Sequence, residues 1–215
     1  MEKEELIRLG KGEVLVVPVI RGLVSEGERV RGAVLKFSPV MVAMSISPEE
    51  LTALKQHDGK DLEPMSGTLE ENVYEGGLCK FGGVARPPRC FTAALEVAKE
   101  QGIETAGVDL TEAEFTQAYV HLVSGWDFVR KTLGGGRFSR AKFDLSSAEA
   151  FVLDWDRRLR KAKGYDALER RREAQVSRGV AELVERKGKV VAIVELERVS
   201  GVVERLKRLA SPESQ

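Results

Sequence analysis

Four short apolar runs most constrain what this chain can fold into. They cover residues 14–20, 40–46, 103–109 and 189–196, and each is aliphatic or β-branched and bounded by glycine, proline or charge. Nearly continuous hydrophobicity, rather than alternation, is typical of parallel strands that are covered on both faces. Because parallel neighbours need long crossover connections, we expect helices to fill the spaces between these strands.

The segments between the strands carry signals for helix starts. The capping-box pattern, a hydroxyl residue followed three positions later by Glu, occurs at Ser25, Ser47, Thr111 and Ser146. After Thr111, apolar side chains at helical spacing predict one long amphipathic helix up to Gly134. We interpret its apolar stripe as core or as a subunit contact: Phe115, Ala118, Tyr119, Leu122, Trp126 and Val129.

Alternation of strands and helices over the whole length predicts an α/β fold. We expect a mostly parallel central sheet flanked by helices, with a helical excursion over about residues 111–187 before the last strand. The glycine-rich text between Lys55 and Arg86 predicts irregular structure with short helices at most, and the charged helical excursion is expected to break near Gly164. The loop 134–140 is the only candidate linker, so residues 1–215 are interpreted as a single domain.

Charge and hydropathy exclude several classes of protein. Lys plus Arg and Asp plus Glu are 34 each, so no global field attracts nucleic acid or an acidic membrane. Apolar runs fall far short of the roughly 20 residues of a membrane span, and the amino terminus lacks a signal segment. We therefore expect a cytoplasmic protein. The basic runs 157–163 and 170–172 are interpreted as solvated helix faces, and the 32% charged residues favour a thermophilic source.

Cysteines and histidines give no recognisable catalytic motif. The spacing of Cys79 and Cys90 does not suggest a zinc site, and it leaves open either two free thiols or a disulfide. His57 lies in a polar turn and His121 in the middle of a helix, so we do not expect them to form a site together. A P-loop, a Gly-x-Ser-x-Gly elbow and a Cys-x-x-Cys pair are all absent from the sequence.

Six segments in a fixed order carry a resemblance to a known family. Pro18-Val-Ile-Arg21 stands where that family has Gly-Thr-Ala-His, and residues 38–46, "SPVMVAMSI", stand at the strand that ends in Glu-Leu. The other segments are 83–94, 102–110, 168–171 and 189–201. Together, over about residues 12–207, they resemble the TraB family, which includes the PrgY pheromone-shutdown proteins and is grouped with TIKI proteases and erythromycin-esterase-like enzymes.

The resemblance keeps the apolar scaffold but replaces most of the family's polar positions. Arg21 and Arg198 stand at its two histidines, Ser45 and Cys90 at two of its glutamates, and Glu195 and Glu197 at two glycines. The retained family positions are Asp109, Glu169 and Arg170. Family members are proposed to hydrolyse a peptide or related bond, with the histidines and glutamates around a metal. A guanidinium has no lone pair for a metal, so no metal and no cofactor are expected here.

The resemblance implies that the chain is a pseudoenzyme. We expect a catalytically degenerate TraB-like protein that acts by binding or assembly, as a homodimer, with a partner protein or an active homologue. Arg21, Ser45, Glu195, Glu197 and Arg198 are then expected to form an ion-pair cluster over a degenerate pocket.

Two alternatives stay open. In the first, the same arginines grip a phosphate or carboxylate, which would make the chain a divergent enzyme or a sensor of an anionic small molecule. The second is a hydrolase centred on Cys90, for which the sequence shows no histidine base.

Overall fold

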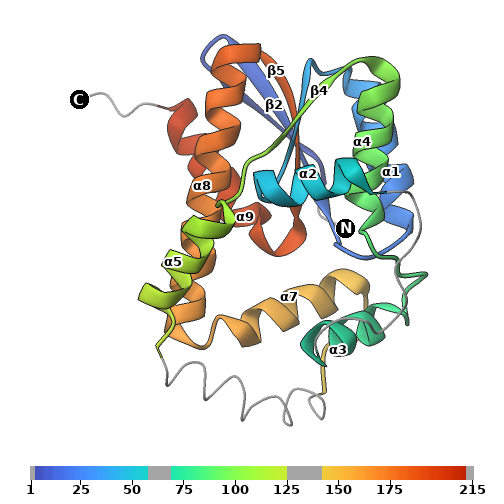
Figure 1. Ribbon diagram of the computed structural model, residues 1–215, viewed down its shortest axis with the longest axis vertical. Helices are drawn as coiled ribbons and strands as arrows, with labels where there is room; N and C mark the ends of the chain where they lie inside the picture. The colour runs from blue at the N-terminus through green and yellow to red at the C-terminus, as the bar shows by residue number, and fades with distance from the viewer. Residues whose placement is uncertain (1–2, 58–68, 125–141, 212–215) are drawn as a thin grey trace.

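A five-stranded sheet forms the centre of the chain in the computed structural model, which describes residues 3–57, 69–124 and 142–211 (Figure 1). The strand order is β1-β2-β5-β3-β4. Strand β1 is antiparallel to β2, whereas β2, β5, β3 and β4 run parallel. This confirms the predicted α/β fold. The strands are β1 (Glu5–Leu9), β2 (Gly12–Val19), β3 (Met41–Met44), β4 (Glu104–Gly107) and β5 (Lys189–Glu195).

Two helical layers cover the two faces of the sheet. Helices α1 (Ser25–Phe37) and α4 (Arg89–Gln101) pack against each other and cover one face. Helices α8 (Lys163–Lys187) and α9 (Leu196–Ala210) cover the other (Figure 1). The next helix along the chain after β3 is α2 (Pro48–Gln56), which contacts β4.

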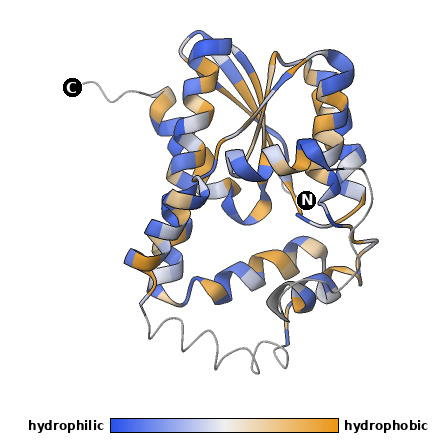
Figure 2. Cartoon of the chain, viewed as in Figure 1, coloured by the Kyte–Doolittle hydropathy of each residue, from blue (hydrophilic) through white to orange (hydrophobic). Residues whose placement is uncertain are grey.

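Residues of β5 show why its sequence is apolar without alternation. Val190, Ala192 and Val194 belong to the core under α8 and α9. Val191 and Ile193 belong to the core under α1 and α4. Both faces of the strand are therefore buried, as Figure 2 shows by the apolar colour along the central strands.

Three further helices lie beyond the carboxyl ends of the parallel strands (Figure 1). They are α3 (Leu69–Leu78), α5 (Glu112–Leu122) and α7 (Ala148–Leu159). Phe151 and Trp155 of α7 pack with Leu78 of α3 and with Ile20, just after β2. This separate apolar cluster holds α3 and α7 against the strand ends. The predicted helical excursion is thus present between β4 and β5. No helix among the described residues is long and apolar enough to span a membrane.

Two of the predicted capping boxes form differently from expectation. At α2, Ser47 accepts the Glu50 amide at 3.0 Å, but the Glu50 carboxylate binds Arg21 rather than the helix start. Helix α1 starts at Ser25 with Val24 as its cap residue and no side-chain cap, so that prediction was wrong.

The other two boxes also differ from each other. Thr111 forms the complete capping box with Glu114. Helix α7 begins one residue later than expected, because Ser147 accepts the Ala150 amide at 3.1 Å while Ser146 bonds to Asp144.

The long helix predicted after Thr111 is shorter than expected. Helix α5 ends at Leu122, and Ala118 packs inside the chain against Tyr165 and Leu168 of α8. In the described part of the stripe, Ala118 is buried, Tyr119 and Leu122 are partly buried, and Phe115 is exposed. Trp126, Val129 and the loop 134–140 lie outside the described residues.

Two other local predictions, short helices at most between 55 and 86 and a helix break near Gly164, agree with the structure in outline. The text between 55 and 86, expected to be irregular, contains the ten-residue helix α3, although 58–68 lie outside the described residues. The break in the charged helical region falls at 160–162, and Gly164 lies inside α8.

Candidate functional site

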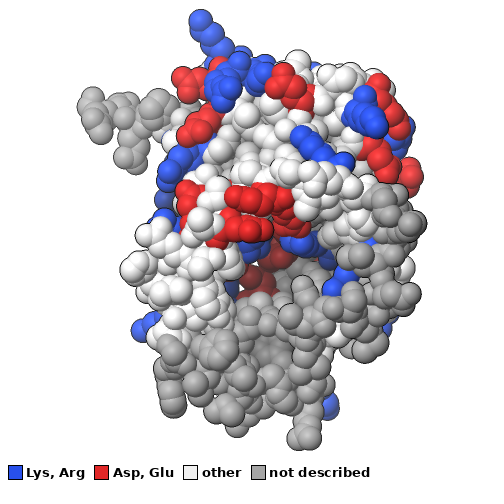
Figure 3. Space-filling view, viewed as in Figure 1, with Lys and Arg blue, Asp and Glu red and all other residues white. Residues whose placement is uncertain are grey.

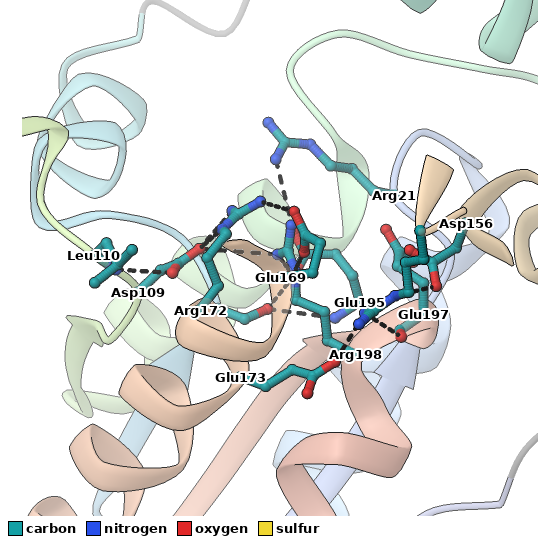
Figure 4. A network of polar contacts seen from close by, with 12 residues as sticks. Arg21, Asp109, Leu110, Asp156, Glu169, Arg172, Glu173, Glu195, Glu197 and Arg198 are labelled. Carbon is teal, nitrogen blue, oxygen red and sulfur yellow. Dashed lines mark hydrogen bonds and ion pairs between the residues drawn. The ribbon is translucent and has the colours of Figure 1, made fainter. Parts of the chain in front are cut away.

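The carboxyl ends of the parallel strands bring charged and polar side chains from four parts of the sequence together. Arg21 follows β2, Ser45 follows β3, Asp109 follows β4, and Glu195 ends β5. Arg198 joins them from the first turn of α9. Figure 4 shows these charged side chains converging in one network. Parallel strands end on the same side of a sheet, which is why residues so distant in sequence meet here.

Arg198 is the buried centre of the network. Its Nε donates to Glu169 Oε2 at 2.9 Å, and its Nη1 lies 2.9 Å from Glu195 Oε2 and 3.8 Å from Asp109 Oδ2. Burial alone would lower the pKa of this guanidinium, but the surrounding carboxylates outweigh burial and raise the pKa well above its usual value. Arg198 is therefore a fixed positive charge whose contacts are carboxylates.

Helix α8 contributes a second arginine that the sequence did not single out. Arg172 donates through Nε to Asp109 Oδ2 at 2.9 Å and through Nη1 to Glu169 Oε1 at 3.2 Å. Burial opposes ionisation of Glu169, yet Arg198 and Arg172 outweigh it and lower the Glu169 pKa to about 2. The interpretation of 170–172 as a solvated face was therefore wrong for Arg172.

The other basic run, 157–163, also turns one arginine inward. Arg160 donates through Nε to Asp156 at 2.6 Å and through Nη2 to Glu173 at 2.8 Å. Arg157 keeps 74% of its side chain exposed, as the sequence predicted for the run as a whole.

Arg21 lies at the edge of the network and is partly open to solvent. Its side chain is 40% exposed, its Nη2 donates to Glu50 Oε1 at 2.6 Å, and its Nη1 lies 3.6 Å from Glu195 Oε1. Ser45 is buried and donates to the Glu195 carboxylate, which fixes that group from the β3 side. The pKa of Glu195 is lowered because Arg198 and Arg21 outweigh the effect of complete burial.

Glu197 differs from every other carboxylate in this network. It lies in the first turn of α9, and no ion pair joins it to Arg21 or Arg198 among the described contacts. Its Oε2 is buried and accepts no hydrogen bond from a described residue. Burial, together with the nearby charge of Glu195, raises the pKa of Glu197 to about 7. The expected ion-pair cluster thus includes Glu195 but leaves Glu197 outside.

The remaining predicted positions lie outside the network. Cys90 is fully buried in the core under α4, and burial raises the pKa of its thiol, which disfavours a reactive thiolate. Cys79 is exposed and both cysteines are free, so the disulfide alternative was wrong. Arg170 is exposed and pairs with Asp166 at 2.9 Å, one turn earlier in α8.

A cleft of about 690 Å³ opens beside the network. Its walls come from the strand ends, from α2, α3, α5, α7, α8 and α9, and from residues 85–88. Figure 3 shows a hollow in this face of the molecule, with acidic and basic side chains inside it. The aromatic lining residues are Tyr74, Phe115, Tyr119, Trp155 and Tyr165. The volume of the cleft and its mixed polar and aromatic lining are typical of a small-molecule binding site.

The donor groups around the cleft favour ion pairing over metal binding. Among residues 3–57, 69–124 and 142–211, no three His, Cys, Asp or Glu side chains are grouped so that they could hold a metal ion. The carboxylates of Asp109, Glu169 and Glu195 all contact guanidinium groups instead. No protein-family model and no curated protein matches this chain.

Proposed function

We propose that this chain is a binding protein without catalytic activity, built on a TraB-like scaffold, and that it takes a small-molecule ligand in the strand-end cleft. The observation that carries the proposal is the state of the charges in the cleft. Arg198 occupies the centre, where the resemblance implies a histidine, and holds Glu169 and Glu195 at 2.9 Å each. The groups in these pairs neither hold a metal nor transfer a proton, and Glu197 is the one carboxylate of the cleft lining that lies outside such a pair among the described residues.

The cleft itself argues against a purely structural role for the network. A volume of about 690 Å³ remains open beside the paired charges, so the ion pairs line a pocket and do not fill it. An anion at Arg21 and Arg198 is less well supported, because Glu50, Glu195 and Glu169 already contact those guanidinium groups. A bound phosphate would have to displace these carboxylates from the guanidinium groups. The displaced carboxylates would remain negatively charged and would repel the phosphate.

We also propose a location, an oligomeric state and a partner for this chain, on the basis of the resemblance and the composition. The chain acts in the cytoplasm, it self-associates as a homodimer, and its partner is another protein or an active homologue. In the apolar stripe expected at the dimer interface, Ala118 packs inside the chain on Leu168, whereas Phe115 stays exposed.

Thermal unfolding of the full chain with a ligand panel tests the proposed function. The panel contains amino acids, nucleotides, sugar phosphates and polyamines. We expect at least one class to raise Tm by about 5 °C or more at 100 times its Kd. Ala85→Trp, which fills the cleft, should abolish the shift, and the exposed control Ala53→Trp on α2 should keep it.

Mass spectrometry after long incubation completes this test. We expect each stabilising compound to be recovered unchanged. Formation of product that Ala85→Trp abolishes would contradict the absence of catalysis, and a panel without any shift would contradict ligand binding.

A further inference from the structure

The charges that line the cleft do not balance. Six carboxylates and five guanidiniums line it, and five of those carboxylates each pair with a different arginine. The pairs are Arg21–Glu50, Arg86–Glu75, Arg160–Asp156, Arg172–Glu169 and Arg198–Glu195. Glu197 is the lining carboxylate left over among the described residues.

Glu197 is costly to the fold in this state. Its residue keeps some surface toward the cleft, but Oε2 is buried without a hydrogen-bond partner among the described residues. A buried acceptor with no donor loses its hydration and gains nothing in return. Arg198 Nη1 in the same wall also makes no hydrogen bond, but it lies 2.9 Å from the charge of Glu195 Oε2, whereas Glu197 Oε2 has no such counter-charge among the described ion pairs. A ligand that supplies a donor would explain Glu197.

One aromatic ring, that of Tyr74, lies close to Glu197. Tyr74 and Trp155 line the same cleft, with ring centroids 5.3 Å apart in an edge-to-face arrangement. Burial and the charges of Glu197 and Glu195 raise the pKa of Tyr74 well above its usual value, so its ring is neutral and close to both carboxylates. An aromatic ring next to a carboxylate favours an organic cation, because both attract positive charge, and Tyr74 and Glu197 share this cleft.

We propose that the cleft binds an organic cation, whose ammonium or guanidinium group donates to Glu197 beside Tyr74 and Trp155. This inference rests on the proposed function, since it names the ligand class of the same cleft. The cleft is large enough for the rest of a drug-sized molecule, which would lie against Val152 and Leu159. A bare divalent cation fits less well, because it needs several oxygen ligands and one carboxylate supplies too few.

Calorimetric titration of the full chain at pH 8 tests the ligand class. The cationic probes are agmatine and phenethylammonium, and 2-phenylethanol and 3-phenylpropanoate are the neutral and anionic counterparts of the second. We expect both cations to bind and both counterparts to fail. Glu197→Gln should weaken cation binding at least about tenfold, the loss expected for a charge-assisted hydrogen bond.

Two controls separate binding from folding. Glu204→Gln, on the exposed face of α9 and paired with Arg208, should bind the cations as wild type does. Glu197→Gln should not lower Tm, because the amide keeps the shape and removes a buried charge. A lowered Tm together with no cation binding to wild type would mean that the chain itself satisfies Glu197, which overturns the inference.

The pH dependence of cation affinity distinguishes direct binding by Glu197 from a purely structural role of Glu197, which would not change that dependence. Glu197 faces Glu195 from β5, Arg198 on its own helix, Asp156 and Arg160 from the α7 region, and Tyr74 from α3. With a pKa of about 7, Glu197 is mostly protonated at pH 6 and mostly ionised at pH 8. Cation affinity should therefore fall by up to about tenfold from pH 8 to pH 6 in wild type and stay flat in Glu197→Gln.

Two further outcomes distinguish failure of the proposed ligand class, an organic cation, from failure of the proposed function, ligand binding in the cleft. If the cations fail while another compound class raises Tm in a way that Ala85→Trp abolishes, the inference is wrong and the proposed function stands. If 3-phenylpropanoate binds more tightly than phenethylammonium, the cleft is an anion site and the inference is wrong.

Discussion

At the residue scale, Arg198 decides whether the network is stable. Arg198→Met leaves Glu195 and Glu169 buried without their main counter-charge, so we expect a loss of about 3–5 kcal/mol in the free energy of unfolding at pH 7. Urea unfolding measures this loss. The control Arg170→Met removes only an exposed pair with Asp166 and should change stability by less than about 0.5 kcal/mol.

The loss in the free energy of unfolding caused by Arg198→Met should depend on pH, because Arg198 pairs with the titratable carboxylate of Glu169. Its pKa in the folded chain, about 2, lies below the usual 4.5, so its pairing stabilises the fold above pH 4.5 and loses effect as pH falls toward 2. The gap in the free energy of unfolding between wild type and Arg198→Met should therefore narrow as pH falls toward 2. A gap that widens on acidification would contradict the assignment of Arg198 as the partner of Glu169.

The sequence predicts those site residues that directly follow a strand. Arg21, Ser45 and Asp109 could be placed together because parallel strands end at one edge. Arg172 was missed because the many charged residues of α8 make its buried face hard to recognise from the sequence. One signal existed: Leu168, Arg172 and Val176 recur at four-residue spacing along the buried stripe of α8.

At the element scale, one glycine sets how closely α3 approaches α7. A Cβ at Gly77 would overlap the Phe151 ring, which is held in an aromatic cluster with Tyr74 and Trp155. Gly77→Ala should therefore destabilise the chain by about 1–3 kcal/mol. Hydrogen exchange should locate the loss of protection in α3 and α7. Gly76→Ala is the matched control, since nothing lies within 4 Å of its added Cβ, and it should stabilise α3 by about 1 kcal/mol.

Strands were most predictable where both faces are buried, as in β3 and β5, whose hydrophobicity is continuous. The edge strand β4 was also predicted, although none of its residues is buried. Strand β1 was missed because it buries only Ile7 and reads as polar. It joins β2 through a tight turn in which Gly10 takes φ +58°, a conformation that favours glycine. Helix α5 ended early because Val123 turns extended and buries its side chain near Tyr165.

At the scale of the whole molecule, the balance of 34 basic and 34 acidic residues serves internal pairing rather than a long-range field. Self-association is the prediction that belongs to this scale. We expect sedimentation equilibrium of the full chain to give twice the mass of one chain at micromolar concentration. A single-chain mass across the concentration range would contradict the homodimer and leave the cleft unaffected, because every lining residue comes from one chain.

The central claim is that the strand-end charges are locked in ion pairs and that Glu197 alone stands apart. Carboxyl ¹³C NMR titration of the intact chain measures this directly, with assignments from Glu169→Gln, Glu195→Gln and Glu197→Gln. We expect Glu197 to titrate near pH 7, Glu169 to titrate near pH 2, and Glu195 to titrate below pH 4.5. Titration of all three carboxyl groups together near pH 4.5 would contradict the account.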